Sequence, residues 1–127
     1  MLPALTLLLA GVPFVPAGDP PLDLHGECIY PPAVVQAAAG STFVPCRYMR
    51  ADAQGVSFRL SRQSVRFSGT WDGARLDVTA VTDPTGRSAD AEGTCRIDYA
   101  NEAVSLVSCT VLADGRRWLA NFRKSPL

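Results

Sequence analysis

Hydrophobic and polar residues alternate one by one along much of the chain after Ser41. From Val56 to Ser61 every apolar residue is followed by a polar one, and the same period continues from Ser64 to Trp71. A period of two places apolar side chains on one face of a β-strand and polar side chains on the other. These stretches therefore predict strands that bury one face and expose the other.

Turn signals separate the alternating stretches. Asp72-Gly73 follows directly after Trp71 and leads into Arg75–Val81. An Asp-Gly pair between two such runs favours a two-residue hairpin, because both central positions of a type I′ turn need positive φ. Thr82–Gly93 is rich in turn-forming residues throughout, which predicts an exposed loop. Asp114-Gly115 predicts another turn, into a closing strand over 117–122.

A second hairpin is predicted from Gly93–Tyr99 and Val104–Leu112, with residues 100–103 at its tip. If Cys95 lies opposite Cys109, then position 97 faces position 107 on the same side of the ladder, so a disulfide and an apolar row share one face. The same register places Val104 and position 106 on the other face. In the closing strand, apolar side chains gather on one side: Trp118, Ala120 and Phe122.

The N-terminal part of the chain is rich in proline. Gly18–Pro32 contains four prolines, which predicts an extended or looping segment with few ladder hydrogen bonds. Pro32–Gly40 has proline first, alanines in the middle and glycine last, as expected of one short helix. Thr42–Met49 predicts a strand interrupted at Pro45, since proline cannot donate to a ladder.

Together these elements predict a mainly β protein, a small antiparallel barrel or sandwich of about six or seven strands with one short helix, and the barrel is favoured. Residues 1–17 form an expected signal peptide, residues 18–40 the proline-rich segment and helix, and residues 41–127 the antiparallel β domain, which makes one domain with 18–40. The chain length fits a single domain.

Residues 1–17 carry no charged side chain and include the apolar run Leu5–Leu9. Small residues at the end of this stretch predict signal-peptide cleavage after Ala17, although no Lys or Arg opens it as in most signal peptides. The run is interrupted by prolines and is shorter than the roughly 20 apolar residues that span a bilayer. We therefore expect a secreted or periplasmic protein without a membrane span.

An even number of cysteines in a chain with an export signal favours structural disulfides. The four positions allow three pairings, of which proximity favours Cys28 with Cys46 and Cys95 with Cys109. No C-x-x-C motif is present, so no metal site is expected. Each disulfide closes a short loop and is expected to contribute roughly 3 kcal/mol on the chain-entropy model.

Catalytic motifs are scarce. The single histidine, His25, lies between Asp23 and Glu27, and in an extended segment these three side chains point the same way, which fits a metal or acid–base cluster. A lone histidine in a proline-flanked segment is more often an ordinary surface residue, and the sequence favours that interpretation. No nucleophile elbow and no phosphate-binding glycine motif occurs. A formal net charge of zero gives no support for nucleic-acid binding, and no cofactor is expected.

Candidate binding residues remain. Arg59, Arg62 and Arg66 lie on or between two adjacent predicted strands, on the solvent side, where they could bind an acidic partner. Tyr30 marks the segment between Cys28 and Cys46 as a second contact candidate, and the loop Asp83–Glu92 is a third.

The sequence thus favours a non-enzymatic extracytoplasmic binding module that engages a protein partner in the envelope or outside the cell, for instance as an inhibitor or adaptor. One alternative is a small secreted hydrolase that uses His25 or a carboxylate pair. Another is a structural envelope component. The sequence assigns no oligomeric state.

Overall fold

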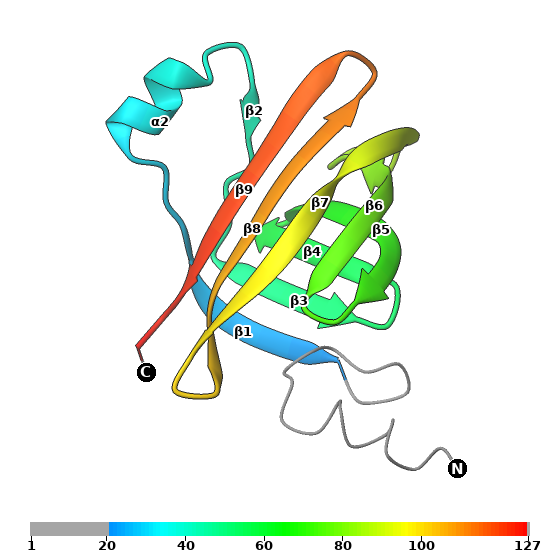
Figure 1. The fold of residues 1–127 in the computed structure, drawn as a ribbon. Helices are drawn as coiled ribbons and strands as arrows, with labels where there is room; N and C mark the ends of the chain where they lie inside the picture. The colour runs from blue at the N-terminus through cyan, green and yellow to red at the C-terminus, as the bar shows by residue number, and fades with distance from the viewer. Residues whose placement is uncertain (1–20, 127) are drawn as a thin grey trace, which may run out of the picture.

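Eight antiparallel strands close into a barrel in the computed structural model, which describes residues 21–126 (Figure 1). Each strand pairs with the next in the order β1-β3-β4-β5-β6-β7-β8-β9, and β9 pairs back with β1, while the short β2 lies parallel to β9. The predicted antiparallel barrel is confirmed, and the predicted signal peptide lies outside the described residues. The elements are β1 (Leu22–Cys28), α2 (Pro32–Ala37), β2 (Thr42–Phe43), β3 (Tyr48–Asp52), β4 (Gly55–Leu60), β5 (Gln63–Asp72), β6 (Arg75–Thr82), β7 (Ser88–Ala100), β8 (Ala103–Ala113) and β9 (Arg116–Lys124).

The proline-rich segment contains a strand, so the expectation of few ladder hydrogen bonds there is wrong. The first half of β1 pairs with β3, and its last three residues, Gly26–Cys28, pair with β9. Pro21, Pro31 and Pro32 lie outside this strand, so every residue within it keeps its backbone N–H for the ladder. This strand closes the barrel and raises the strand count above the one expected.

The predicted helix and interrupted strand are both present in shorter form. The helix covers Pro32–Ala37, with proline at its start, and the chain leaves it through Gly40 at a φ of +90°. The predicted strand over 42–49 is divided at Pro45 into β2 and β3. The division follows from the missing N–H of proline.

The predicted loop over 82–93 is much shorter in the structure. Its turn is confined to the residues around Asp83, whose Oδ1 accepts hydrogen bonds from the backbone N–H groups of Thr85 and Arg87 at 2.8 and 3.1 Å. Strand β7 already begins at Ser88 and pairs with β6, and Ala89 packs against the core. Residues 88–93 have a composition typical of turns, but most of them form a strand because β6 pairs with them.

The register predicted for the second hairpin is confirmed, since Cys95 faces Cys109 and Ile97 faces Val107. The expectation that Val104 lies on the outer face is wrong. The ladder shifts register between Asp98 and Tyr99, and one extra residue in β8 turns Val104 inward, where it is 9% exposed. The tip turns through two residues with positive φ, as a tight hairpin requires.

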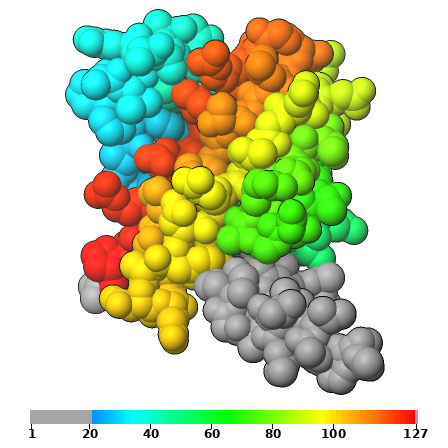
Figure 2. All heavy atoms as spheres, in the orientation of Figure 1, coloured from blue at the N-terminus to red at the C-terminus, as the bar shows by residue number. Residues whose placement is uncertain are grey.

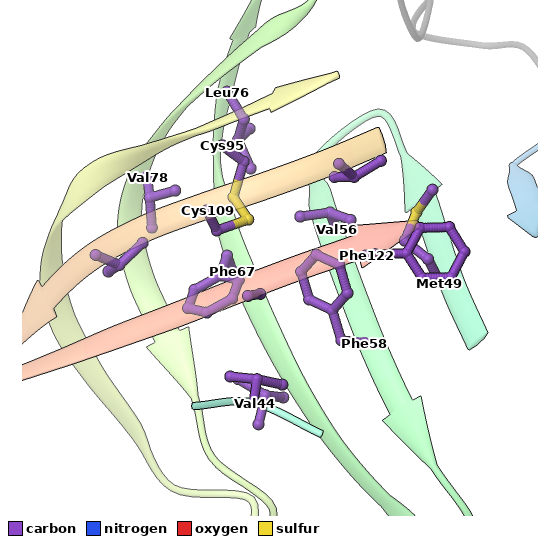
Figure 3. Packing of buried hydrophobic residues seen from close by; sticks show 14 of the residues in the cluster. Val44, Met49, Val56, Phe58, Phe67, Leu76, Val78, Cys95, Cys109 and Phe122 are labelled. Carbon is purple, nitrogen blue, oxygen red and sulfur yellow. A yellow bond between two sulfur atoms is a disulfide. The ribbon is translucent and has the colours of Figure 1, made fainter. Parts of the chain in front are cut away.

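Buried side chains from seven of the eight barrel strands, β3 to β9, fill the barrel interior, and partly buried residues of β1 pack against them (Figure 3). Phe58, Phe67 and Phe122 are fully buried, and the first two make an edge-to-face contact with ring centroids 6.0 Å apart. Trp118 is also buried, as its alternation predicts. Gly69 lets β5 approach β6 closely, because a Cβ atom there would lie 1.9 Å from a backbone carbonyl oxygen.

Both disulfides favoured by sequence proximity are present. Cys95–Cys109 links directly opposed residues of β7 and β8 inside the barrel, with Cα atoms 4.0 Å apart. Cys28–Cys46 joins the last residue of β1 to a cysteine two residues before β3, with Cα atoms 5.0 Å apart. Two disulfides of this kind fit an extracellular protein.

Candidate binding surfaces

The three predicted arginines have different surroundings. Arg66 is half-buried: its guanidinium lies 3.0 Å from the carboxylate of Asp52 and donates to the Ser57 hydroxyl at 3.1 Å. Burial is the largest single influence on the pKa of Asp52 and raises it, but the hydrogen bond and charge of Arg66, together with backbone hydrogen bonds from Gln54 and Gly55, outweigh burial and hold that pKa below its usual range. Arg66 therefore forms an ion pair with Asp52, within the same chain, on the outer side of the barrel wall.

Arg59 and Arg62 remain exposed. Arg62 lies in the turn between β4 and β5, whereas Arg59 lies on β4 with its guanidinium carbon 5.1 Å from the centre of the Tyr48 ring. The predicted arginine trio does not converge on one point. The structure instead brings Arg59 together with Tyr48 and His25, two residues that sequence periodicity did not connect with it.

Strand register places four of the outward side chains in a row across the barrel wall. Ser64 on β5 faces Arg59 on β4, which faces Tyr48 on β3, which faces His25 on β1. Directly opposed side chains in antiparallel strands are about 5 Å apart, close enough to contact one another. The rings of Tyr48 and His25 have centroids 5.1 Å apart.

A second row runs beside the first, from Arg66 through Ser57 and Arg50 to Asp23. Arg50 and Asp23 form an exposed ion pair at 3.1 Å. The outer surface between the two rows is hollowed, with a volume of about 500 Å³. We call it the arginine–tyrosine hollow; it is lined by Asp23, Leu24, His25, Tyr48, Met49, Arg50, Ser57, Arg59 and Ser64.

Asp23, His25 and Glu27 point to the same side of β1 and are exposed, as an extended segment predicts. The carboxylate of Asp23 accepts a hydrogen bond from the guanidinium of Arg50 at 3.1 Å. Within residues 21–126, no group of three or more His, Cys, Asp or Glu side chains is arranged to hold a metal ion. The three side chains thus share a face of the strand without forming a cluster.

The second candidate surface is the segment that the Cys28–Cys46 disulfide closes. We call residues 29–45 the α2 loop; it contains no charged residue. Residues 31–37 are all exposed, and none of the helix is buried. Val34 and Val35 are 43% and 42% exposed, which is high for large apolar side chains. Figure 2 shows this loop at the molecular surface beside the C-terminal strands.

Tyr30 holds the α2 loop in place. Its hydroxyl lies within hydrogen-bond distance of the carbonyl oxygens of Val44 and Leu119, and its ring makes an edge-on contact with Phe43. Burial raises the pKa of this phenol to about 12. Asn121 adds a further hydrogen bond, from its side-chain amide to the carbonyl of residue 29 at 2.9 Å. Tyr30 is thus positioned to anchor the loop, while the exposed helix residues provide its free surface.

Comparisons with protein-family models, with curated proteins and with solved structures found no match to this chain. Among residues 21–126, no helix is long and apolar enough to cross a membrane.

Proposed function

We propose that this chain is a non-enzymatic extracytoplasmic binding module that engages another protein through the α2 loop. The observation that carries the proposal is the run of exposed residues 31–37, uncharged and partly apolar, on a loop fixed at both ends. A contiguous patch of apolar groups at the surface commonly marks an interaction site, whereas isolated apolar residues do not, and residues 31–37 are exposed without a break. The disulfide and the Tyr30 anchor restrict the loop, which lowers the entropy lost on binding.

Two features support a location outside the cytoplasm. The two disulfides would be reduced in most cytoplasmic compartments, and residues 1–17 have the apolar run and small residues of an export signal. The partner is accordingly expected in the envelope or outside the cell, and inhibition of a secreted enzyme is one role such a loop can serve.

The non-enzymatic part of the proposal is supported by the placement of the single histidine. His25 stands on the outer wall of the barrel, beside a carboxylate that is already paired with Arg50. Groups used for acid–base chemistry are usually held in sheltered sites within hydrogen-bond reach of the substrate. A binding role makes no such demand on His25.

The proposal is tested by Val35→Asp, with Leu112→Asp as the matched control. Leu112 is 51% exposed and lies on β8, outside the α2 loop, so both variants place a carboxylate at an exposed apolar position. We expect the wild-type chain, cross-linked in the envelope fraction, to capture one defined protein. Val35→Asp should lower its affinity for that protein at least about tenfold, and Leu112→Asp less than about twofold.

The fold of each variant is checked by its melting temperature. Equal losses of affinity in both variants, or unchanged affinity in Val35→Asp, would contradict a role for the α2 loop. A turnover that disappears in His25→Ala would replace the proposal with the hydrolase alternative. Concentration-dependent self-association without a distinct partner would instead favour a structural component.

A further inference from the structure

The neutral total charge conceals two oppositely charged parts of the barrel. Residues 69–115, which form the end of β5 and all of β6, β7 and β8, carry eight acidic and three basic side chains. The other described residues, 21–68 and 116–126, carry three acidic and nine basic side chains, with His25 taken as neutral. The arginine–tyrosine hollow lies in the basic part, on the outer face of β1, β3, β4 and β5.

Within the hollow the two arginines differ in what neutralises them. Arg50 is paired with Asp23 at 3.1 Å. Arg59 makes no ion pair among the described residues, and its guanidinium rests over the Tyr48 ring instead. A cation over an aromatic face is restrained in position but keeps its charge. The N–H groups at its edges stay available to a planar carboxylate, which a guanidinium binds with two parallel hydrogen bonds.

We propose that the arginine–tyrosine hollow binds an acidic peptide segment of a protein partner, with a carboxylate of that segment on Arg59. The volume of about 500 Å³ lies in the range of known ligand sites, roughly 300–1,000 Å³. The hydroxyls of Ser57 and Ser64 line the same hollow and can both donate and accept hydrogen bonds. They suit the alternating N–H and C=O groups of a peptide backbone.

Asp23 favours a peptide over a uniform polyanion. Its carboxylate lies in the same hollow as Arg59 and already pairs with Arg50, so a ligand that is negative along its whole length must either face that carboxylate or displace it from Arg50. A peptide can place a neutral or basic residue opposite Asp23 and still present a carboxylate to Arg59. This surface is separate from the α2 loop, so failure of binding at one leaves the other proposal intact.

The test uses the oxidised full chain and a fluorescent peptide of alternating Glu and Ser, with binding followed by anisotropy at low and physiological salt. Arg59→Gln should weaken binding about tenfold, because it removes a charge-assisted hydrogen bond. Arg117→Gln is the matched control, since Arg117 is exposed and lies at the start of β9, outside the hollow. We expect it to change binding less than about twofold.

Polyphosphate is the competing probe. We expect polyphosphate to bind the wild-type chain more weakly than the peptide does, and to bind Asp23→Asn more tightly than the wild type. The Tyr48→Phe variant keeps the ring under Arg59, so we expect it to retain peptide binding. No peptide binding, or equal losses in Arg59→Gln and Arg117→Gln, would overturn the proposal, as would tighter binding of polyphosphate by the wild type. A mass that rises with concentration at low salt and falls in Arg59→Gln would assign the hollow to a second copy of the chain, and would also overturn it.

Discussion

In the barrel wall nearly every inward side chain is buried, whereas the α2 loop leaves two large apolar side chains, Val34 and Val35, exposed. Phe67 is fully buried among other core residues, but Val35 has no comparable cover although both are apolar. The wall derives its stability from the burial of apolar surface. Apart from Val44, which is buried in the core, the loop contributes little burial and depends on a covalent link and a few hydrogen bonds for its shape.

The two disulfides differ in the same way. Cys95–Cys109 joins two neighbours of a ladder that is hydrogen-bonded on both sides of the link. Cys28–Cys46 lies where the chain leaves β1 and where it returns to the barrel, so it bounds the loop instead of bridging the wall. The first is expected to act mainly on global stability and the second also on local opening of the loop.

The largest expected effect separates wall from loop by truncating one apolar side chain in each. Phe67→Ala should lower the free energy of unfolding by about 3 to 5 kcal/mol, because it removes a large buried side chain and leaves a cavity. Val35→Ala should change it by less than about 0.5 kcal/mol, because the side chain is already in water. Urea denaturation of both variants measures the difference. A cost above about 1 kcal/mol for Val35→Ala would show that the loop is part of the core.

The next effect concerns the disulfides. Replacing Cys95 and Cys109 together by alanine should lower the free energy of unfolding by roughly 3 kcal/mol on the chain-entropy model, enough to lower the melting temperature by about 10 °C or more. Replacing Cys28 and Cys46 opens a loop of similar length, since these cysteines are 18 residues apart and the other pair is 14 apart, so the same model assigns it a similar loss.

Limited proteolysis under native conditions distinguishes the two double variants. Without Cys28–Cys46 we expect rapid cleavage within the α2 loop, whereas the variant without Cys95–Cys109 should resist cleavage there until it unfolds globally. If both variants were cleaved equally slowly within the α2 loop, the loop would be held by its hydrogen bonds without the disulfide.

Much of the barrel could be predicted from sequence because its strands alternate strictly. The period of two gave the strand over 56–60 and the inward row of β9, and the spacing of cysteines gave the register of the second hairpin. The failures occur where long-range pairing overrides local chemistry. β1 and the start of β7 are strands because neighbouring strands pair with them; their alternation is present, but it lies next to prolines in one case and among turn-forming residues in the other.

The bulge at Ser105 shows the same limit on a smaller scale, since one extra residue in β8 brings Val104 back to the interior.

The candidate site was predicted only in part for a related reason. Arg59 could be placed on an outer face from its own strand, but its neighbours Tyr48 and His25 come from strands whose pairing the sequence does not state. Likewise, nothing in the sequence distinguishes Tyr30 as an anchor from Tyr30 as a contact.

The smallest effect tests that anchor through pH. Burial raises the pKa of Tyr30 to about 12 in the folded protein, above the ordinary value of 10.0. The folded state therefore holds this proton more tightly than the unfolded state, so the stabilisation is complete below pH 10 and is lost as the pH rises toward 12. Because the side chain is partly exposed, we expect the loss to be about 1 to 2 kcal/mol.

Tyr30→Phe provides the reference, because burial also raises the pKa of Tyr99 and that contribution is common to both proteins. Near pH 8 the variant should be less stable than the wild type by about 1 kcal/mol, the value of a hydrogen bond to the carbonyl groups of β9 and of residue 44. Toward pH 12 the difference should shrink and reverse, since an ionised Tyr30 in the wild type would face two carbonyl oxygens and the phenylalanine would not. Denaturation curves across this range, with tyrosinate absorbance to follow ionisation, measure both quantities. A difference independent of pH would show that the phenol ionises without disturbing the loop, and the hold on the α2 loop would then rest on Cys28–Cys46 and Asn121.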